Sequence, residues 1–250
     1  MSTRIFKVWR GDKTGGQLVD YQVEVQDGMV VLDAIHQIQR DHAHDLACRW
    51  NCKAAKCGSC SAEVNGKPRL MCKTRLDDFA PGQTITVRPM KSFPLIRDLV
   101  TDVSWNFTVN KKIPPFTPRP DAVWLMQQED VDRSQEFRKC IECFLCQNVC
   151  HVLREHDLEP EFYGPRFFAR IASLEMHPLD SLDRTGLLKD QGGIGLCNIT
   201  KCCTEVCPEE IHITDNAIIP LKERVVDKYY DPIRIALRIL TGGGRDSAKK

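Results

Sequence analysis

Cysteine is the residue type with the clearest capacity for chemistry in this chain, because most of its cysteines stand at short, regular gaps. The 250 residues include 13 cysteines. Three groups contain eleven of them: Cys52, Cys57, Cys60 and Cys72; Cys140, Cys143, Cys146 and Cys150; Cys197, Cys203 and Cys207. Short gaps let several thiolate sulfurs from one loop surround a single metal core. The groups therefore predict metal centres.

The first group has the spacing C-x4-C-x2-C with a distant fourth cysteine, which is typical of a plant-type [2Fe-2S] site. Gly58 and the small residues Ala54 and Ala55 allow backbone amides to approach the cluster sulfurs, and such hydrogen bonds raise the reduction potential. Four thiolates also suit Zn²⁺. The spacing, in a segment with many strand signals, favours iron over zinc.

The second group has the run C-x2-C-x2-C-x3-C of bacterial ferredoxins, in which the fourth cysteine binds the neighbouring cluster. This exchange predicts a [4Fe-4S] cluster on Cys140, Cys143, Cys146 and Cys207, the last of which precedes Pro208.

The same exchange assigns Cys150 to a third centre, together with Cys197 and Cys203. A complete set would need a cysteine at position 200, where the chain has Thr200. Three thiolates predict a [3Fe-4S] cluster, which lacks the iron that a fourth ligand would hold. Such a centre often has a higher potential, which suits the acceptor end of an electron path.

Other candidates are weaker. Cys48 is interpreted as a packed thiol, and Cys202 is left out because adjacent residues rarely direct their side chains at one cluster. His42 and His44 are interpreted as a solvated helix end. Gly192–Gly195 is interpreted as a loop leading to Cys197, since no strand precedes it. Without a dinucleotide fingerprint, hydride chemistry is assigned to another subunit.

Composition excludes several classes of protein. Hydrophobic residues make up 42% and charged residues 28% of the chain, as in soluble globular proteins, and the net charge of +1 gives no nucleic-acid signal. The N-terminus has no apolar signal segment, so the thiols are expected to be reduced and cytosolic. No apolar stretch is long enough to cross a bilayer.

The pattern along the first part of the chain predicts a mixed domain over residues 1–108. Residues 5–10 and 18–25 are expected to form a β-hairpin, and Asn65-Gly66 a second hairpin turn. Apolar residues from Val31 to Ile38 recur at helical spacing, and residues 84–88 predict a further strand.

Prolines in residues 109–120 predict a stiff linker, and residues 121–250 are expected to be mainly helical. Phe167, Phe168, Ile171 and Leu174 stand at helical spacing. Residues 231–240 predict a basic amphipathic helix closed by Gly242–Gly244. Packing of this helix on its own domain is favoured over contact with a membrane. The fold class is α+β.

Both cluster modules in this order, the proline-rich segment and the non-cysteine at position 200 together resemble the iron–sulfur subunit of succinate dehydrogenase and fumarate reductase. Residues 93–100 also resemble the family's stretch after the first domain. The resemblance implies a β-grasp plant-type ferredoxin domain followed by an all-α bacterial-type ferredoxin domain. It further implies a relay from an FAD-bearing flavoprotein through [2Fe-2S], [4Fe-4S] and [3Fe-4S] to a quinone at a membrane anchor. The subunit would then be a peripheral membrane protein on the cytoplasmic side, in the tricarboxylic acid cycle and the respiratory chain.

The chain departs from the ubiquinone-using branch of this family. His151, Arg154 and Glu155 replace a proline and a tryptophan pair of the quinone pocket, and Asn198 replaces a histidine. The resemblance therefore favours the branch with one haem b-bearing anchor chain and menaquinone as acceptor. Quinone ligands are not transferred to this chain.

Two alternatives stay open beside succinate oxidation. The same relay can run in the fumarate reductase direction, and another flavin dehydrogenase can use a similar iron–sulfur subunit. A zinc-organised structural or nucleic-acid module is disfavoured by the near-neutral charge.

Overall fold

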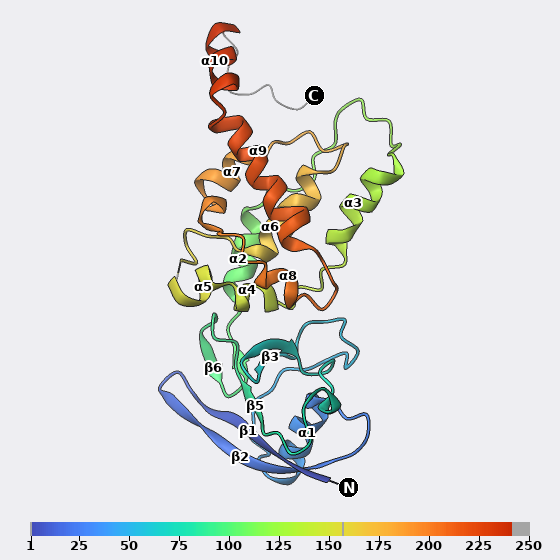
Figure 1. Cartoon of the computed structure of the whole chain (residues 1–250), viewed down its shortest axis with the longest axis vertical. Helices are drawn as coiled ribbons and strands as arrows, with labels where there is room; N and C mark the ends of the chain where they lie inside the picture. Colours follow the sequence, from blue (N-terminus) through green and yellow to red (C-terminus); the bar gives the residue numbers. More distant parts are fainter. Residues whose placement is uncertain (1, 157, 242–250) are drawn as a thin grey trace. The chain divides into compact units, whose positions relative to one another are not determined.

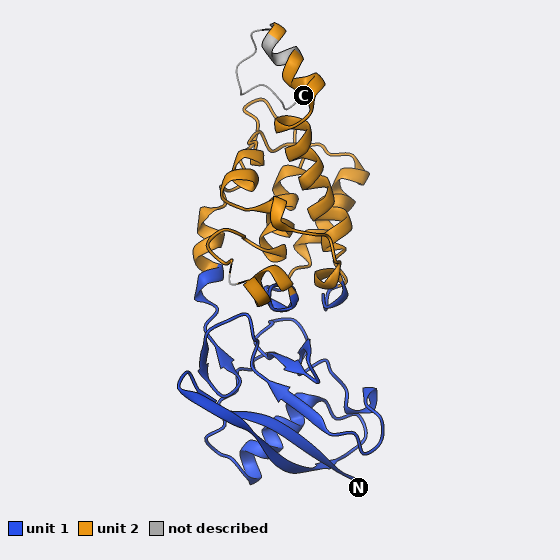
Figure 2. Ribbon diagram, turned by 60° about the vertical axis from the view of Figure 1, so that its left-hand side comes forward, with its two compact units in different colours: residues 1–106, 141–149, 205–209 blue, residues 107–140, 150–204, 210–250 orange. Residues whose placement is uncertain are grey.

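The computed structural model describes residues 2–156 and 158–241, and these residues form two compact units. Figure 2 shows that neither unit is a continuous piece of chain. The first unit takes residues 1–106, 141–149 and 205–209, and the second takes residues 107–140, 150–204 and 210–250. The boundaries at 1–108, 109–120 and 121–250 remain a prediction. The glycines 242–244, expected to close the last helix, lie outside the described residues.

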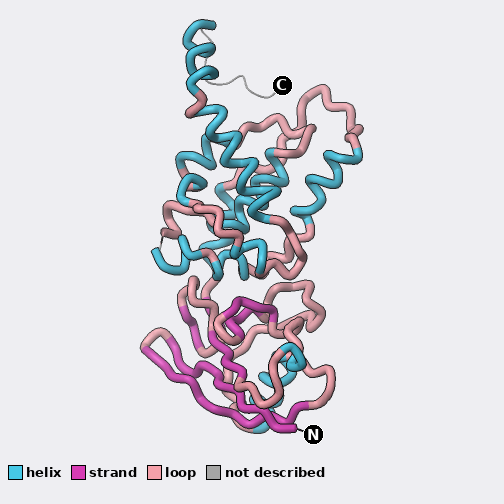
Figure 3. Tube along the Cα trace, in the orientation of Figure 1, coloured by secondary structure: helices cyan, strands magenta, loops and turns pink. Residues whose placement is uncertain are grey.

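A mixed sheet forms the first unit (Figures 1 and 3). Its strands are β1 (Ser2–Asp12), β2 (Gly15–Val25), β3 (Ser61–Val64), β4 (Lys67–Leu70), β5 (Ile85–Arg88), β6 (Leu95–Arg97) and β7 (Val100–Thr101). The order is β4-β3-β5-β1-β6-β7, and β2 pairs with β1. β1 runs antiparallel to β2 and parallel to β5. The fold class predicted from the sequence is confirmed.

The helix and both hairpins expected in this unit are present. α1 (Val31–Asp41) buries Leu32, Ile35 and Ile38 in the core. Its N-terminus is capped because the Asp33 carboxylate accepts a hydrogen bond from the Val30 amide at 3.1 Å. The β1–β2 hairpin is longer than predicted. A short helical turn, η1 (Leu76–Asp78), follows the second hairpin.

Residues 141–149 are built into the first unit although they lie far along the chain. The Ser61 hydroxyl donates to the Cys143 carbonyl at 2.9 Å, and the Asn148 side-chain amide donates to the buried Glu63 carboxylate at 2.9 Å. The closest approach is at Gly58, where a Cβ atom would lie 2.6 Å from the Cys143 Cα. Gly58 also has a φ of +69°. This position therefore requires glycine for two independent reasons.

Residues 205–209 reach the same unit through polar contacts. Lys73 Nζ donates to the Pro208 carbonyl oxygen at 2.7 Å, and Lys56 Nζ pairs with the Glu209 carboxylate at 3.2 Å. Cys207, which directly precedes Pro208, is thereby held near β4.

Helices dominate the rest of the chain. They are α2 (Ser104–Lys112), α3 (Gln128–Arg138), α4 (Leu145–Val149), α5 (His151–His156), α6 (Pro165–Glu175), α7 (Thr185–Asp190), η2 (Ile194–Leu196), α8 (Cys202–Glu205), η3 (Ile213–Ile218), α9 (Ile219–Tyr229) and α10 (Pro232–Thr241). The predicted helix at residues 167–174 is confirmed in α6, whose apolar side chains Phe167, Phe168 and Ile171 are buried.

A buried arginine holds the proline-rich segment to the second unit. α2 ends at Lys112, and residues 113–120 have no helix or extended strand. The Arg184 guanidinium donates to the carbonyl oxygens of Pro114 at 3.1 Å and Pro115 at 2.6 Å. It also pairs with Asp180 at 2.9 Å and lies 3.6 Å from the Glu175 carboxylate. These charges are fully buried, so they depend on one another.

We expect Arg184→Met to destabilise the second unit by about 3–5 kcal/mol, because it removes the buried cation that pairs with Asp180 and donates to the carbonyl oxygens of Pro114 and Pro115. Thermal or urea denaturation of the full chain measures this. The control is Arg40→Met, which removes an arginine that is paired with Asp41 at the surface. Equal midpoints for the two variants would show that the buried charges do not support this unit.

We expect Gly58→Ala to destabilise the first unit by about 1–3 kcal/mol more than Gly66→Ala. Both glycines have a left-handed φ, +69° and +75°, but a Cβ at Gly66 would meet nothing within 4 Å. The difference between the two melting curves therefore isolates the approach to Cys143. If the two variants melt together, this contact is not tight in solution.

Candidate metal centres

The loop between α1 and β3 carries Cys52, Cys57 and Cys60, and Cys72 follows β4. The amides of Ala54 and Lys56 donate to the Cys52 sulfur, both at 3.3 Å. The Ala55 amide donates to the Cys72 sulfur at 3.3 Å. The loop is thus closed onto the cysteine behind β4.

Left-handed backbone at Lys53 and Ala55, both with φ of 55°, turns successive amides toward the sulfurs. The Cys72 amide in turn donates to the Cys60 sulfur at 3.4 Å. Amide dipoles directed at sulfur stabilise negative charge on it, as a bound cluster requires. The donor set of the first group therefore fits an iron–sulfur cluster.

The thiols of this group have contrasting acidities. Burial alone would raise the pKa of Cys57, but hydrogen bonds involving Ser59 and Cys52 outweigh it, and the pKa falls to about 7. Burial raises the pKa of Cys60 to about 12. Cys57 is therefore more ready than Cys60 to become a thiolate at neutral pH.

Of the four thiols predicted to hold the [4Fe-4S] cluster, Cys143, Cys146 and Cys207 belong to the first unit, whereas Cys140 belongs to the second. Cys143 and Cys146 are buried. Cys143 stands between two left-handed residues, Glu142 with φ of 55° and Phe144 with φ of 60°.

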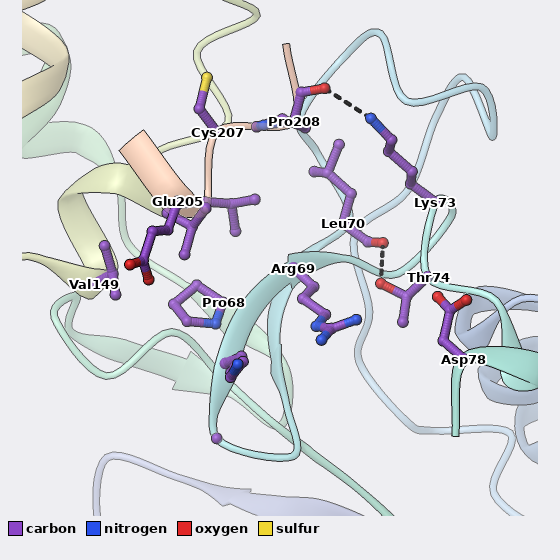
Figure 4. A pocket seen from close by; sticks show the side chains of 14 residues that line it. Pro68, Arg69, Leu70, Lys73, Thr74, Asp78, Val149, Glu205, Cys207 and Pro208 are labelled. Carbon is purple, nitrogen blue, oxygen red and sulfur yellow. Dashed lines mark hydrogen bonds between the residues drawn. The ribbon is translucent and has the colours of Figure 1, made fainter. Parts of the chain in front are cut away.

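Cys207 borders a pocket of about 470 Å³ in the first unit, shown in Figure 4. The basic residues Lys67, Arg69 and Lys73 line it together with apolar side chains such as Leu70. The bond from Lys73 to Pro208 closes one side, so the Cys207 segment has a defined position against β4.

The three thiols predicted to hold the [3Fe-4S] cluster, Cys150, Cys197 and Cys203, belong to the second unit. Burial raises the pKa of Cys150 to about 12 and that of Cys203 to about 11. Such thiols stay protonated unless a positive charge is bound, and iron supplies one. The group thus offers buried sulfur ligands of the kind that a cluster uses.

A pair of threonines orients a hydroxyl toward the Cys203 sulfur. The Thr214 amide donates to the Thr204 hydroxyl oxygen at 3.0 Å, and the Thr204 hydroxyl donates to Thr214 Oγ1 at 3.2 Å. Thr214 Oγ1 lies 3.3 Å from the Cys203 sulfur. Because a ligand thiolate has no proton, the Thr214 hydroxyl is then the donor.

Position 200 has the backbone of a ligand position but not the side chain. Thr200 stands between two left-handed residues, Ile199 with φ of 61° and Lys201 with φ of 63°. Cys143 stands between left-handed residues in the same way. Sequence spacing predicts that Thr200 stands where a fourth ligand is missing, whereas the repeated backbone pattern is visible only in the structure. The Thr200 hydroxyl lies 3.3 Å from the Cys202 sulfur.

The residues that the sequence ranked as weaker metal ligands, Cys48, His42 and His44, and the glycine-rich segment before Cys197 all contact other parts of the chain or lie in regular turns. Cys48 packs against the core of the first unit, and burial raises its pKa to about 12. His44 Nδ1 lies 2.7 Å from the Gln39 carbonyl oxygen, and the His42 ring packs near Tyr21. Gly193, with φ of 60°, lies in a tight turn before η2, which precedes Cys197.

Within residues 2–156 and 158–241, no three His, Cys, Asp or Glu side chains are close enough to hold a single metal ion. Over the same described part of the chain, no helix has the length and apolar character needed to cross a membrane.

Family models of known proteins match both the expected [2Fe-2S] domain and the expected [4Fe-4S] domain. The model described as "2Fe-2S iron-sulfur cluster binding domain" matches residues 4–108, and the one described as "4Fe-4S dicluster domain" matches residues 136–211.

Individual relatives cover most of the chain. The fumarate reductase iron-sulfur subunit of Mycobacterium tuberculosis is 33% identical over 76% of this chain and 79% of its own length. That of Haemophilus influenzae is 32% identical over 78% and 81%. A chain of the solved Mycobacterium smegmatis Sdh1 complex in the apo form is 62% identical, with a TM-score of 0.90 over 92% of this chain and 98% of that one.

The donor sets and the similarity along most of the chain lead to one conclusion. This chain belongs to the iron–sulfur subunits of the succinate dehydrogenase and fumarate reductase family, which transfer electrons within an oxidoreductase complex.

Proposed function

We propose that this chain is the electron relay of a succinate dehydrogenase. Electrons would leave the FAD of a flavoprotein partner and pass through [2Fe-2S], [4Fe-4S] and [3Fe-4S] centres to a quinone, menaquinone, at a haem-bearing membrane anchor. When bound, the clusters supply one-electron redox chemistry. The chain itself holds the sulfurs, keeps water from the buried ones and directs amides at them.

The observation that carries this proposal is the contact between Gly58 and Cys143. Gly58 lies between two ligands of the first centre, and Cys143 is a ligand of the second. A Cβ at Gly58 would be 2.6 Å from the Cys143 Cα, so the two ligand loops touch through their backbones. Centres held by loops in contact are suited to electron transfer from one to the other.

The three-iron assignment of the last centre rests on position 200. The backbone there has the left-handed flanks seen around Cys143, yet the side chain is a hydroxyl. Oxygen of a neutral hydroxyl is a poor iron ligand beside thiolate. The Thr214 hydroxyl near Cys203 would favour the reduced cluster, as hydrogen bonds to sulfur do.

The reverse direction is the second candidate, because two similar proteins are named fumarate reductase iron-sulfur subunits. The relay would then carry electrons from a quinol to the flavoprotein. Assembly with that partner and an anchor would place the subunit at the cytoplasmic side of the membrane. Membrane assays of succinate-driven and quinol-driven turnover separate the two directions.

The whole relay predicts about nine iron atoms per chain, two, four and three in the respective clusters. Iron analysis and low-temperature EPR of the anaerobically purified complex, poised at several potentials, check the number and type of centres. A preparation that contains zinc, or that lacks an oxidised three-iron signal, would contradict the proposal.

We expect Thr200→Cys to convert the three-iron centre into a four-iron centre, since it supplies a thiolate where the backbone already has a ligand geometry. The oxidised three-iron EPR signal should fall and iron content should rise by about one atom per chain. Thr200→Ser is the matched control and should keep the signal. If the well-folded Thr200→Cys variant kept an undiminished three-iron signal, position 200 would not be the place of the missing fourth ligand.

A further inference from the structure

The last helix, α10, presents apolar side chains that its own unit does not cover. Ile233 is 70% exposed and Leu240 is 81% exposed. Sequence analysis favoured packing of this helix against its own domain, but these side chains point away from such a core. Val226 in α9 and Tyr230, the residue just after α9, are also exposed.

The helix has two chemically distinct faces. Ile233 and Leu240 are seven residues apart, so they share one face of the helix. Arg234, the residue after Ile233, lies on another face. Apolar residues on one side and a basic residue on the other are typical of helices that lie in a membrane interface.

Charge is also concentrated at this end of the chain. The sequence from Pro232 to Lys250 has five basic residues and one acidic residue, although the whole chain is nearly neutral. Arg234 lies 3.5 Å from Asp227 and 3.8 Å from Asp231, so these carboxylates balance part of its charge. The other basic residues still outnumber the acidic one. This excess is complementary to an anionic lipid surface.

Length decides how such a helix can meet a bilayer. The ten residues of α10 span only about 15 Å, about half of a hydrocarbon core. The helix can therefore lie along the surface but cannot cross it.

We propose that α10 binds the surface of a membrane, with Ile233 and Leu240 inserted among the lipids and Arg234 at anionic headgroups. This contact is made by the chain itself. It adds to any attachment through an anchor subunit and does not depend on the identity of the clusters.

Flotation of the purified full-length chain with lipid vesicles tests this. We expect binding to phosphatidylcholine vesicles that contain about one third phosphatidylglycerol, and binding at least about fivefold weaker to pure phosphatidylcholine. Added salt should weaken the first interaction. Failure of the wild-type chain to bind the anionic vesicles would overturn the proposal.

Two variants assign the contact to α10. The double variant Ile233→Glu/Leu240→Glu should lose at least about tenfold in binding, because two apolar groups no longer insert. Arg234→Gln/Arg238→Gln should lose most of the preference for phosphatidylglycerol. The matched control is Leu125→Glu, which changes a leucine that is 80% exposed elsewhere in the second unit and should bind like the wild type.

The remaining outcomes are also decisive. Wild-type binding by the Ile233→Glu/Leu240→Glu variant would show that another surface meets the lipid. Sedimentation can find a dimer for the wild type and a monomer for this variant, with no vesicle binding by either. That result would assign the apolar face of α10 to contact with a second copy of this chain instead of lipid. Circular dichroism of each variant checks that the helices are kept.

Discussion

The approach of Gly58 to Cys143 is the constraint on which the first unit depends. Two loops that are 85 residues apart meet with no side chain between them, and Ser61 and Glu63 add polar bonds to the same segment. The Glu63 carboxylate is buried, which would be costly without a hydrogen-bond donor. The Asn148 side-chain amide supplies such a donor. Sheet, cysteine loop and segment 141–149 are therefore parts of one packing arrangement.

A second theme is the balance between burial and charge at the cysteines. Burial raises the pKa of Cys60, Cys150 and Cys203, which by itself disfavours the thiolate. The Cys72 amide at the Cys60 sulfur and the Thr214 hydroxyl at the Cys203 sulfur compensate in part. The bound iron has to supply the remainder, so occupancy of the sites and stability of the fold are linked.

The sequence predicted the parts that follow from local pattern. Cysteine spacing indicated the 2Fe-2S and 4Fe-4S modules that the family models match, and apolar periodicity indicated α1 and α6, because both signals lie within a few residues. The short strands β6 and β7 were missed, since three or fewer residues carry no readable alternation. The left-handed flanks of Cys143 and Thr200 could not be predicted either, because Glu142, Phe144, Ile199 and Lys201 are not residue types that favour positive φ.

The interrupted course of the chain through the first unit has a consequence for how the protein is made. Residues 141–149 and 205–209 complete a unit that began at the N-terminus. During synthesis, the early sheet therefore emerges with an unfinished surface near Gly58 and β4. It can be closed only after residues 205–209 have left the ribosome. If the N-terminal portion were excised, it would expose this surface, unlike an independent small redox protein.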